Sequence, residues 1–107
     1  MIRAAFDPCG DKLRLRVNGH AEYSESGSDI VCAAISGMFY SLLGYLLACH
    51  KESMEIGRIE HGYAELYCPF CAEENLKQTC IGFLQIEHTY PHCVEVSNNV
   101  WIDGFEQ

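Results

Sequence analysis

A histidine and a cysteine near the amino terminus are the residues of this chain best suited to chemistry. Gly19-His20-Ala21 is followed, after seven residues, by Asp29-Ile30-Val31-Cys32-Ala33-Ala34. An imidazole can act as a general base, and a thiol that it deprotonates is a nucleophile for acyl transfer. We therefore interpret His20 and Cys32 as a candidate base and nucleophile.

The elements around the pair would decide where the two side chains lie. Apolar and polar residues alternate over 13–18, which predicts a strand, so His20 would follow a strand end. Ser28 or Asp29 would cap the helix that begins next, and Cys32 would lie in its first turn. Unpaired amides and the positive end of the helix dipole favour a thiolate there.

A structural role is the alternative for both residues. Cys32 would then pack as a small apolar residue, and His20 would bond backbone groups at a strand end. The spacing of the two residues does not by itself decide between catalysis and packing.

The segment from Gly19-His20-Ala21 through Asp29-Ile30-Val31-Cys32-Ala33-Ala34-Ile35-Ser36 closely resembles the ribosomal-processing cysteine protease family Prp. This family belongs to bacteria whose ribosomal protein bL27 carries an N-terminal extension. The resemblance implies a cysteine endopeptidase with His20 and Cys32 as its catalytic dyad. It also implies bL27 as the substrate and a homodimer as the assembly.

Four further residues are expected to support the dyad. Asp29, Cys32 and Ser36 share one helix face, so either polar side chain could orient His20 or the substrate. Asp29 and Ser36 also match positions of the family motif. Gly19 and Gly27 would let the segment between them close over a peptide. Capping by Asp29 and hydroxyl bonding of Ser36 within its own helix are the structural alternatives.

The acidic composition limits the partners. The chain has 107 residues, with 15 acidic and 7 basic residues and a formal net charge of −8. This charge argues against direct nucleic-acid binding and suits a basic partner such as a ribosomal protein tail, although it also serves ordinary solubility. The length predicts a single domain, 1–107.

Seven cysteines are many for this length, and the number is odd. They are Cys9, Cys32, Cys49, Cys68, Cys71, Cys80 and Cys93. The first eleven residues lack the pattern of a secretory signal, so we expect reduced thiols in the cytoplasm rather than a disulfide framework.

The Cys68-Pro69-Phe70-Cys71 motif offers a competing chemistry that the family resemblance does not predict. Two thiols at this spacing suit a thiol redox protein or half of a zinc site. The other zinc ligands would come from 88–93, but a helix over 72–88 is about 25 Å long and separates them from Cys71. We therefore predict no metal and no cofactor, and keep a redox protein as an alternative function.

Twenty residues without a charge, Ile30 to Cys49, are long enough to span a membrane. Cys32, Ser36 and Gly44 interrupt the stretch, and flanking basic clusters are missing. We interpret it as a central helix buried on nearly every side, with one face against a second subunit, and predict a homodimer and no membrane association.

The remaining elements complete an α+β domain. Strands are expected at 2–6, 12–18, 53–59, 62–67 and 94–96, with Met54, Ile56, Ala64 and Leu66 available to face inward. The predicted fold is a two-layer sandwich of order β-β-α-β-β-α-β, with both helices on one side of the sheet. A cysteine endopeptidase is the predicted function, and a non-catalytic ribosome-associated binding protein is the other alternative.

Overall fold

The computed structural model describes residues 1–19 and 28–101, and it has the predicted element order. The elements are β1 (Ile2–Cys9), β2 (Lys12–Asn18), α1 (Ser28–Cys49), β3 (Glu55–Glu60), β4 (Tyr63–Pro69), the short 3-10 helix η1 (Phe70–Ala72), α2 (Glu73–Thr89) and β5 (Val94–Asn98). The predicted order β-β-α-β-β-α-β is confirmed.

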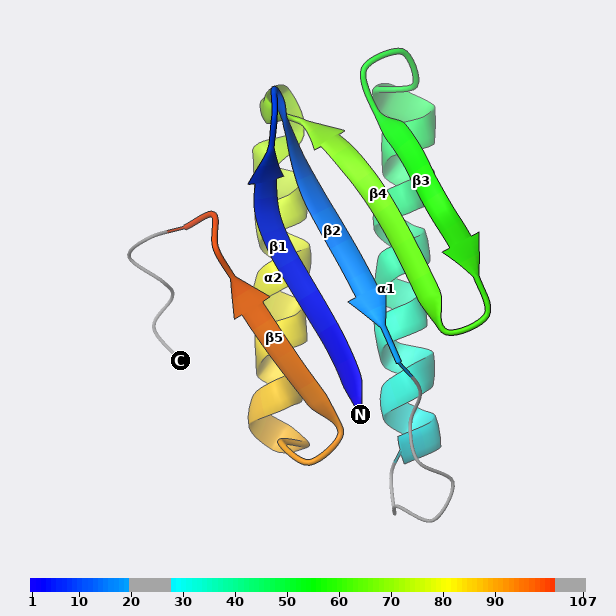
Figure 1. The fold of residues 1–107 in the computed structure, drawn as a ribbon, viewed down its shortest axis with the longest axis vertical. Coiled ribbons are helices and arrows are strands. Elements are labelled where there is room, and N and C mark those ends of the chain that lie inside the picture. Colours follow the sequence, from blue (N-terminus) through cyan, green and yellow to red (C-terminus); the bar gives the residue numbers. More distant parts are fainter. Residues whose placement is uncertain (20–27, 102–107) are drawn as a thin grey trace.

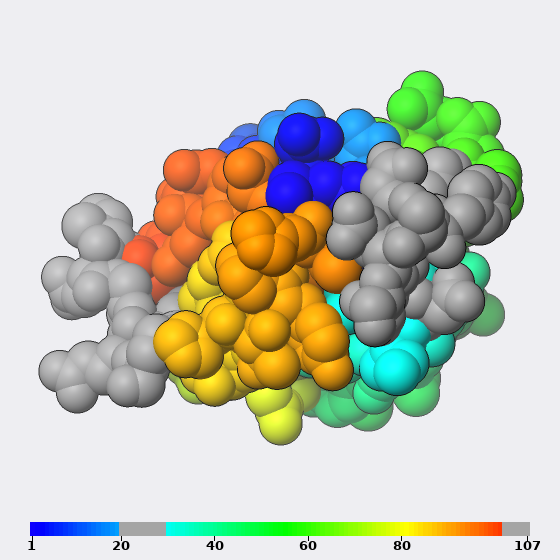
Figure 2. Space-filling view, turned by 90° about the horizontal axis from the view of Figure 1, so that it is seen from below, coloured from blue at the N-terminus to red at the C-terminus, as the bar shows by residue number. Residues whose placement is uncertain are grey.

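The five strands form one sheet in the order β3-β4-β2-β1-β5. β1 pairs antiparallel with β2, β2 with β4, and β4 with β3, whereas β5 runs parallel to β1. Figure 1 shows both helices on the same face of this sheet. Figure 2 shows the sheet and the helices as two stacked layers, which confirms the predicted sandwich.

The core lies between these two layers, because successive side chains of a strand point to opposite faces of the sheet and the apolar ones face the helices. Phe6, Leu13, Leu15 and Leu66 are buried on the face of the sheet that meets the helices. The Phe6 ring packs edge to face on Phe83 of α2, with 5.6 Å between ring centres. These contacts fix the sheet against the helices.

The first turn is shorter than the sequence predicts, because Pro8 belongs to β1. Pro8 pairs with Leu13 of β2, and the pairing of β1 with β5 reaches only to Phe6. A proline has no backbone N–H to donate, so it is tolerated where its other side carries no partner strand. Gly10, with φ of 62°, makes the turn.

One face of α1 is buried and the other is exposed. Only 33% of Ile30–Cys49, whose mean hydropathy is 1.9, is buried within the chain, although by length and composition the helix could cross a membrane. Buried residues recur at Val31, Ile35, Phe39, Leu42 and Leu46. The prediction of burial on nearly every side is therefore wrong for a single chain.

Strand β3 is an edge strand, and its apolar residues are only partly covered by the helices. Ile56 is 45% exposed and Ile59 41% exposed, whereas Met54 just before the strand is buried. The pairing with β4 shifts register between Ile56 and Ile59, which turns the strand locally. Ile56 pairs directly with buried Leu66, so it lies on the face of the sheet that meets the helices, as expected, and its exposure comes from its place on the edge strand.

Candidate active site

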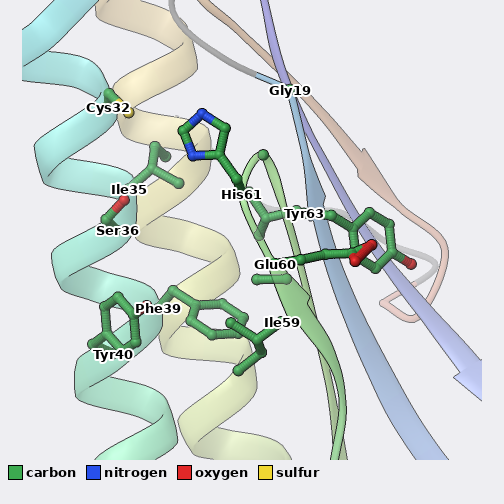
Figure 3. A pocket seen from close by; sticks show the side chains of 13 residues that line it. Gly19, Cys32, Ile35, Ser36, Phe39, Tyr40, Ile59, Glu60, His61 and Tyr63 are labelled. Atoms are coloured by element: carbon green, nitrogen blue, oxygen red, sulfur yellow. The ribbon is translucent and has the colours of Figure 1, made fainter.

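A cleft opens between the amino-terminal half of α1 and the turn that joins β3 to β4. Its volume is about 490 Å³. The wall on α1 includes Cys32, Ser36, Phe39 and Tyr40, and the opposite wall runs from Ile59 to Ala64. Figure 3 shows these two walls facing each other. A cleft of this volume lies within the range of ligand-binding sites in proteins.

The end of β2 forms the floor of the cleft, and a glycine conformation fixes it there. Gly19 lines the cleft with a φ of 104°, and its N–H donates to the carbonyl oxygen of Gly62 at 2.9 Å. A Cβ at this position would overlap the carbonyl oxygen of Met1. Only glycine therefore fits both the conformation and the space.

Cys32 and Ser36 lie one turn apart on α1. The helix begins at Ser28, so Cys32 is its fifth residue, slightly further in than predicted. Cys32 is half-buried and lines the cleft, and Figure 3 shows its sulfur on the side of the cleft. The thiol is thus both supported by packing and accessible.

The β3–β4 hairpin carries a fixed polar cluster on its side away from α1. The Tyr63 hydroxyl donates a 2.7 Å hydrogen bond to Glu65 Oε2. This bond stabilises the carboxylate and the protonated phenol, so it lowers the pKa of Glu65 and raises the pKa of Tyr63. Arg58 stacks over the Tyr63 ring at 4.3 Å from its centre.

The structure brings together three of the six predicted site residues, Gly19, Cys32 and Ser36, all in the lining of the cleft. His20 and Gly27 lie outside the described residues, as does the side chain of Asp29. Their predicted roles therefore stay predictions.

His61 is a cleft residue to which the sequence analysis gave no role. It lies on the wall opposite α1, and Figure 3 shows its ring directed into the cleft toward Cys32. The only sequence signal near it is Gly62, which marks the turn. The contact that brings this turn to the cleft is the hydrogen bond from the Gly19 N–H, next to the end of β2, to the Gly62 carbonyl oxygen.

Comparison with models of protein families assigns the chain to a family. The model of the cysteine protease Prp family matches residues 1–95. The chain belongs to this family. It is accordingly a cysteine protease, and the non-catalytic alternative loses its support.

Solved structures share the Prp fold at low sequence identity. The ribosomal processing protease Prp from S. aureus, in complex with a substrate peptide, has a TM-score of 0.76 and 20% identity, and covers 92% of this chain and 100% of its own. A Streptococcus mutans protein has a TM-score of 0.72 and 22% identity, and covers 94% of this chain and 96% of its own. Comparison with curated protein sequences gives no significant match.

The Cys68–Cys71 motif lies away from the Prp cleft, at the carboxyl end of β4. Cys68 is buried, its thiol donates to the carbonyl oxygens of Pro69 at 3.3 Å and Ala72 at 3.5 Å, and burial raises its pKa to about 11. Cys71 is exposed, with its sulfur 3.7 Å from His50 Nδ1. Neither thiol is in a disulfide.

The described part of the chain has no group of three or more His, Cys, Asp or Glu side chains arranged for a metal ion. The strands flanking the motif, β4 and β5, run in the same direction with α2 between them, but β2 and β1 separate them in the sheet. The thiols therefore do not stand at the start of a compact βαβ unit, where a redox pair of this spacing is expected.

Proposed function

We propose that this protein is a cysteine endopeptidase that removes the N-terminal extension of ribosomal protein bL27, with Cys32 as nucleophile and His20 as base. The observation that carries the proposal is the cleft of a Prp-family chain, which is lined by both Cys32 and Gly19. His20 follows Gly19 directly in the sequence. The pairing of these two side chains is the part of the proposal to be tested.

The reaction has two stages. The Cys32 thiolate attacks the carbonyl carbon of the peptide bond, and protonated His20 gives its proton to the departing amine as the acyl-enzyme forms. His20 then takes a proton from water, which attacks the thioester and releases the new carboxylate and the thiol. Backbone amides in the first turn of α1 are suited to stabilise the oxyanion.

The substrate assignment rests on charge and on cleft shape. The chain carries a formal net charge of −8, which favours encounter with a basic protein tail. The cleft is open and lies between a helix and a strand turn, which suits an extended peptide. The S. aureus Prp, which shares the fold, binds a substrate peptide.

The exposed face of α1 supports a homodimer as part of the proposal. Ile30 is 66% exposed, Tyr40 58%, Leu47 39% and Tyr45 38%, and no charged residue lies between Ile30 and Cys49. An uncharged apolar face of this kind favours association with a second copy. Light scattering should then give the parent protein the mass of two chains and the Leu47→Glu variant the mass of one. A parent protein with the mass of a single chain would reject the dimer.

A reducing cytoplasm is the compartment that we propose. All seven cysteines lie among the described residues, and each is a free thiol. Free thiols in this number are compatible with a compartment that keeps them reduced.

The substrate assignment can be tested with a synthetic peptide that covers the bL27 extension. The purified full chain should cut it at one position, which mass spectrometry would identify, and should leave a peptide of the same composition in scrambled order intact. His20→Ala and Cys32→Ala should each abolish the cut. Equal cleavage of the scrambled peptide, or full activity of Cys32→Ala, would overturn the proposal.

A further inference from the structure

The β3–β4 turn presents one imidazole to the cleft. His61 is exposed and lines the wall opposite Cys32. In Figure 3 its ring points toward α1 and the Cys32 end of the cleft, whereas the side chains of Glu60 and Tyr63 point away from α1. Of the side chains of Glu60, His61 and Tyr63, only that of His61 therefore points into the cleft.

The backbone under His61 is held in place from two sides. Glu60 pairs with Tyr63 across the turn, and Asn18 at the end of β2 pairs with Tyr63 as well. Gly62 adopts a φ of 79°, and its carbonyl oxygen accepts the 2.9 Å hydrogen bond from Gly19. The turn is thus joined to the same strand end that forms the cleft floor, and the imidazole is carried on a fixed support.

A peptide in this cleft needs hydrogen-bond partners for its backbone. The α1 wall offers the hydroxyls of Ser36 and Tyr40, whereas helix backbone groups beyond the first turn bond within the helix and Ile35 and Phe39 are apolar. Among the described residues that line the cleft, His61 is the only one with a nitrogen in its side chain. An imidazole N–H can donate a hydrogen bond to a peptide carbonyl oxygen.

We propose that His61 is a substrate-binding residue: its imidazole donates a hydrogen bond to a main-chain carbonyl of the peptide, beside the bond that is cut. The inference rests on the proposed function, since it needs a peptide in the cleft. His61 takes no part in proton transfer to or from Cys32, which is the role proposed for His20. Its contribution is to the binding of the peptide rather than to the rate of the chemical step.

Steady-state kinetics on the full chain separate these roles. His61→Ala should raise KM about two- to tenfold, the effect of one lost hydrogen bond, with kcat within twofold of the parent. His61→Gln keeps a side-chain N–H donor and should recover part of the loss. His92→Ala, an exposed histidine just before β5, is the matched control and should leave both constants unchanged.

Binding to an inactive enzyme keeps the inference distinct from the proposed function. In a Cys32→Ala background, fluorescence anisotropy with a labelled bL27-extension peptide should show His61→Ala weakening Kd by the same two- to tenfold. An unchanged Kd would overturn the role of His61, even if the parent cuts the peptide. A large loss of kcat in His61→Ala with KM unchanged would also overturn it, because His61 would then act in the chemical step. Thermal melts confirm that each variant is folded.

Discussion

Replacement of Gly19 by alanine should damage the protein more than the same replacement at another glycine of similar conformation. Gly19 has a φ of 104°, and the backbone strain of an alanine there costs about 1–3 kcal/mol. The new Cβ would overlap the Met1 carbonyl oxygen. Relief of that overlap requires a backbone shift, because β1 is held at this end by the 2.8 Å hydrogen bond from Ile2 N–H to the Cys93 carbonyl oxygen.

The shift also threatens the hydrogen bond from Gly19 to Gly62, which is worth about 1 kcal/mol. The sum is a loss of about 2–4 kcal/mol in the free energy of unfolding. This loss corresponds to a fall of about 10–20 °C in Tm for a chain of this size.

Gly10→Ala is the matched control. Gly10 has a φ of 62°, close to the left-handed minimum, and a Cβ there would meet nothing within 4 Å. Its replacement should cost only about 1–2 kcal/mol. Chemical unfolding of the two variants and the parent gives the difference directly, and peptide cleavage well below both melting temperatures should be lower in Gly19→Ala alone. Equal stability losses in the two variants would refute the claim that close backbone approach makes Gly19 necessary.

Three other predictions follow from single contacts. Tyr63→Phe should raise the pKa of Glu65, which NMR titration would measure; an unchanged value would contradict the role of their hydrogen bond. Because the folded pKa of Glu65 is lowered, its stabilising effect is present above the unfolded pKa and should be lost as the pH falls through the folded value. Iodoacetamide at pH 8 should modify exposed Cys71 and spare buried Cys68, whose pKa is raised to about 11, until the protein unfolds; equal rates by mass spectrometry would contradict this burial. Phe6→Ala should cost about 3–5 kcal/mol in denaturant unfolding, because the ring is fully buried; a loss below 1 kcal/mol would show that the core does not depend on it.

Local patterns in the sequence predict most of the fold. Alternation in period two identifies β2 because its apolar residues face one buried layer, and the uncharged run after Asp29 identifies α1 by its length. The second helix, predicted at 72–88, is observed at Glu73–Thr89. These elements form from short-range properties, so a single sequence is enough to find them.

Features that depend on long-range pairing could not be predicted in the same way. Ile56 is apolar and pairs with buried Leu66, yet it is 45% exposed because β3 lies at the edge of the sheet. His61 reaches the cleft only because β4 pairs with β2 at Tyr63 and Asn18. The sequence of α1 has apolar residues on all sides, so it does not show which face of the helix is exposed until its neighbours are known. Sheet order and register decide these positions, and local patterns do not encode them.

The seven free thiols of this chain make the identity of the nucleophile its central question. A peptide that carries the residues before the bL27 cleavage site and ends in a chloromethyl ketone would alkylate the reactive sulfur by displacing chloride. Peptide mapping should find a single adduct on Cys32, formed much more slowly in His20→Ala. An adduct on Cys71, whose sulfur lies beside His50, with Cys32 unmodified, would contradict the assignment.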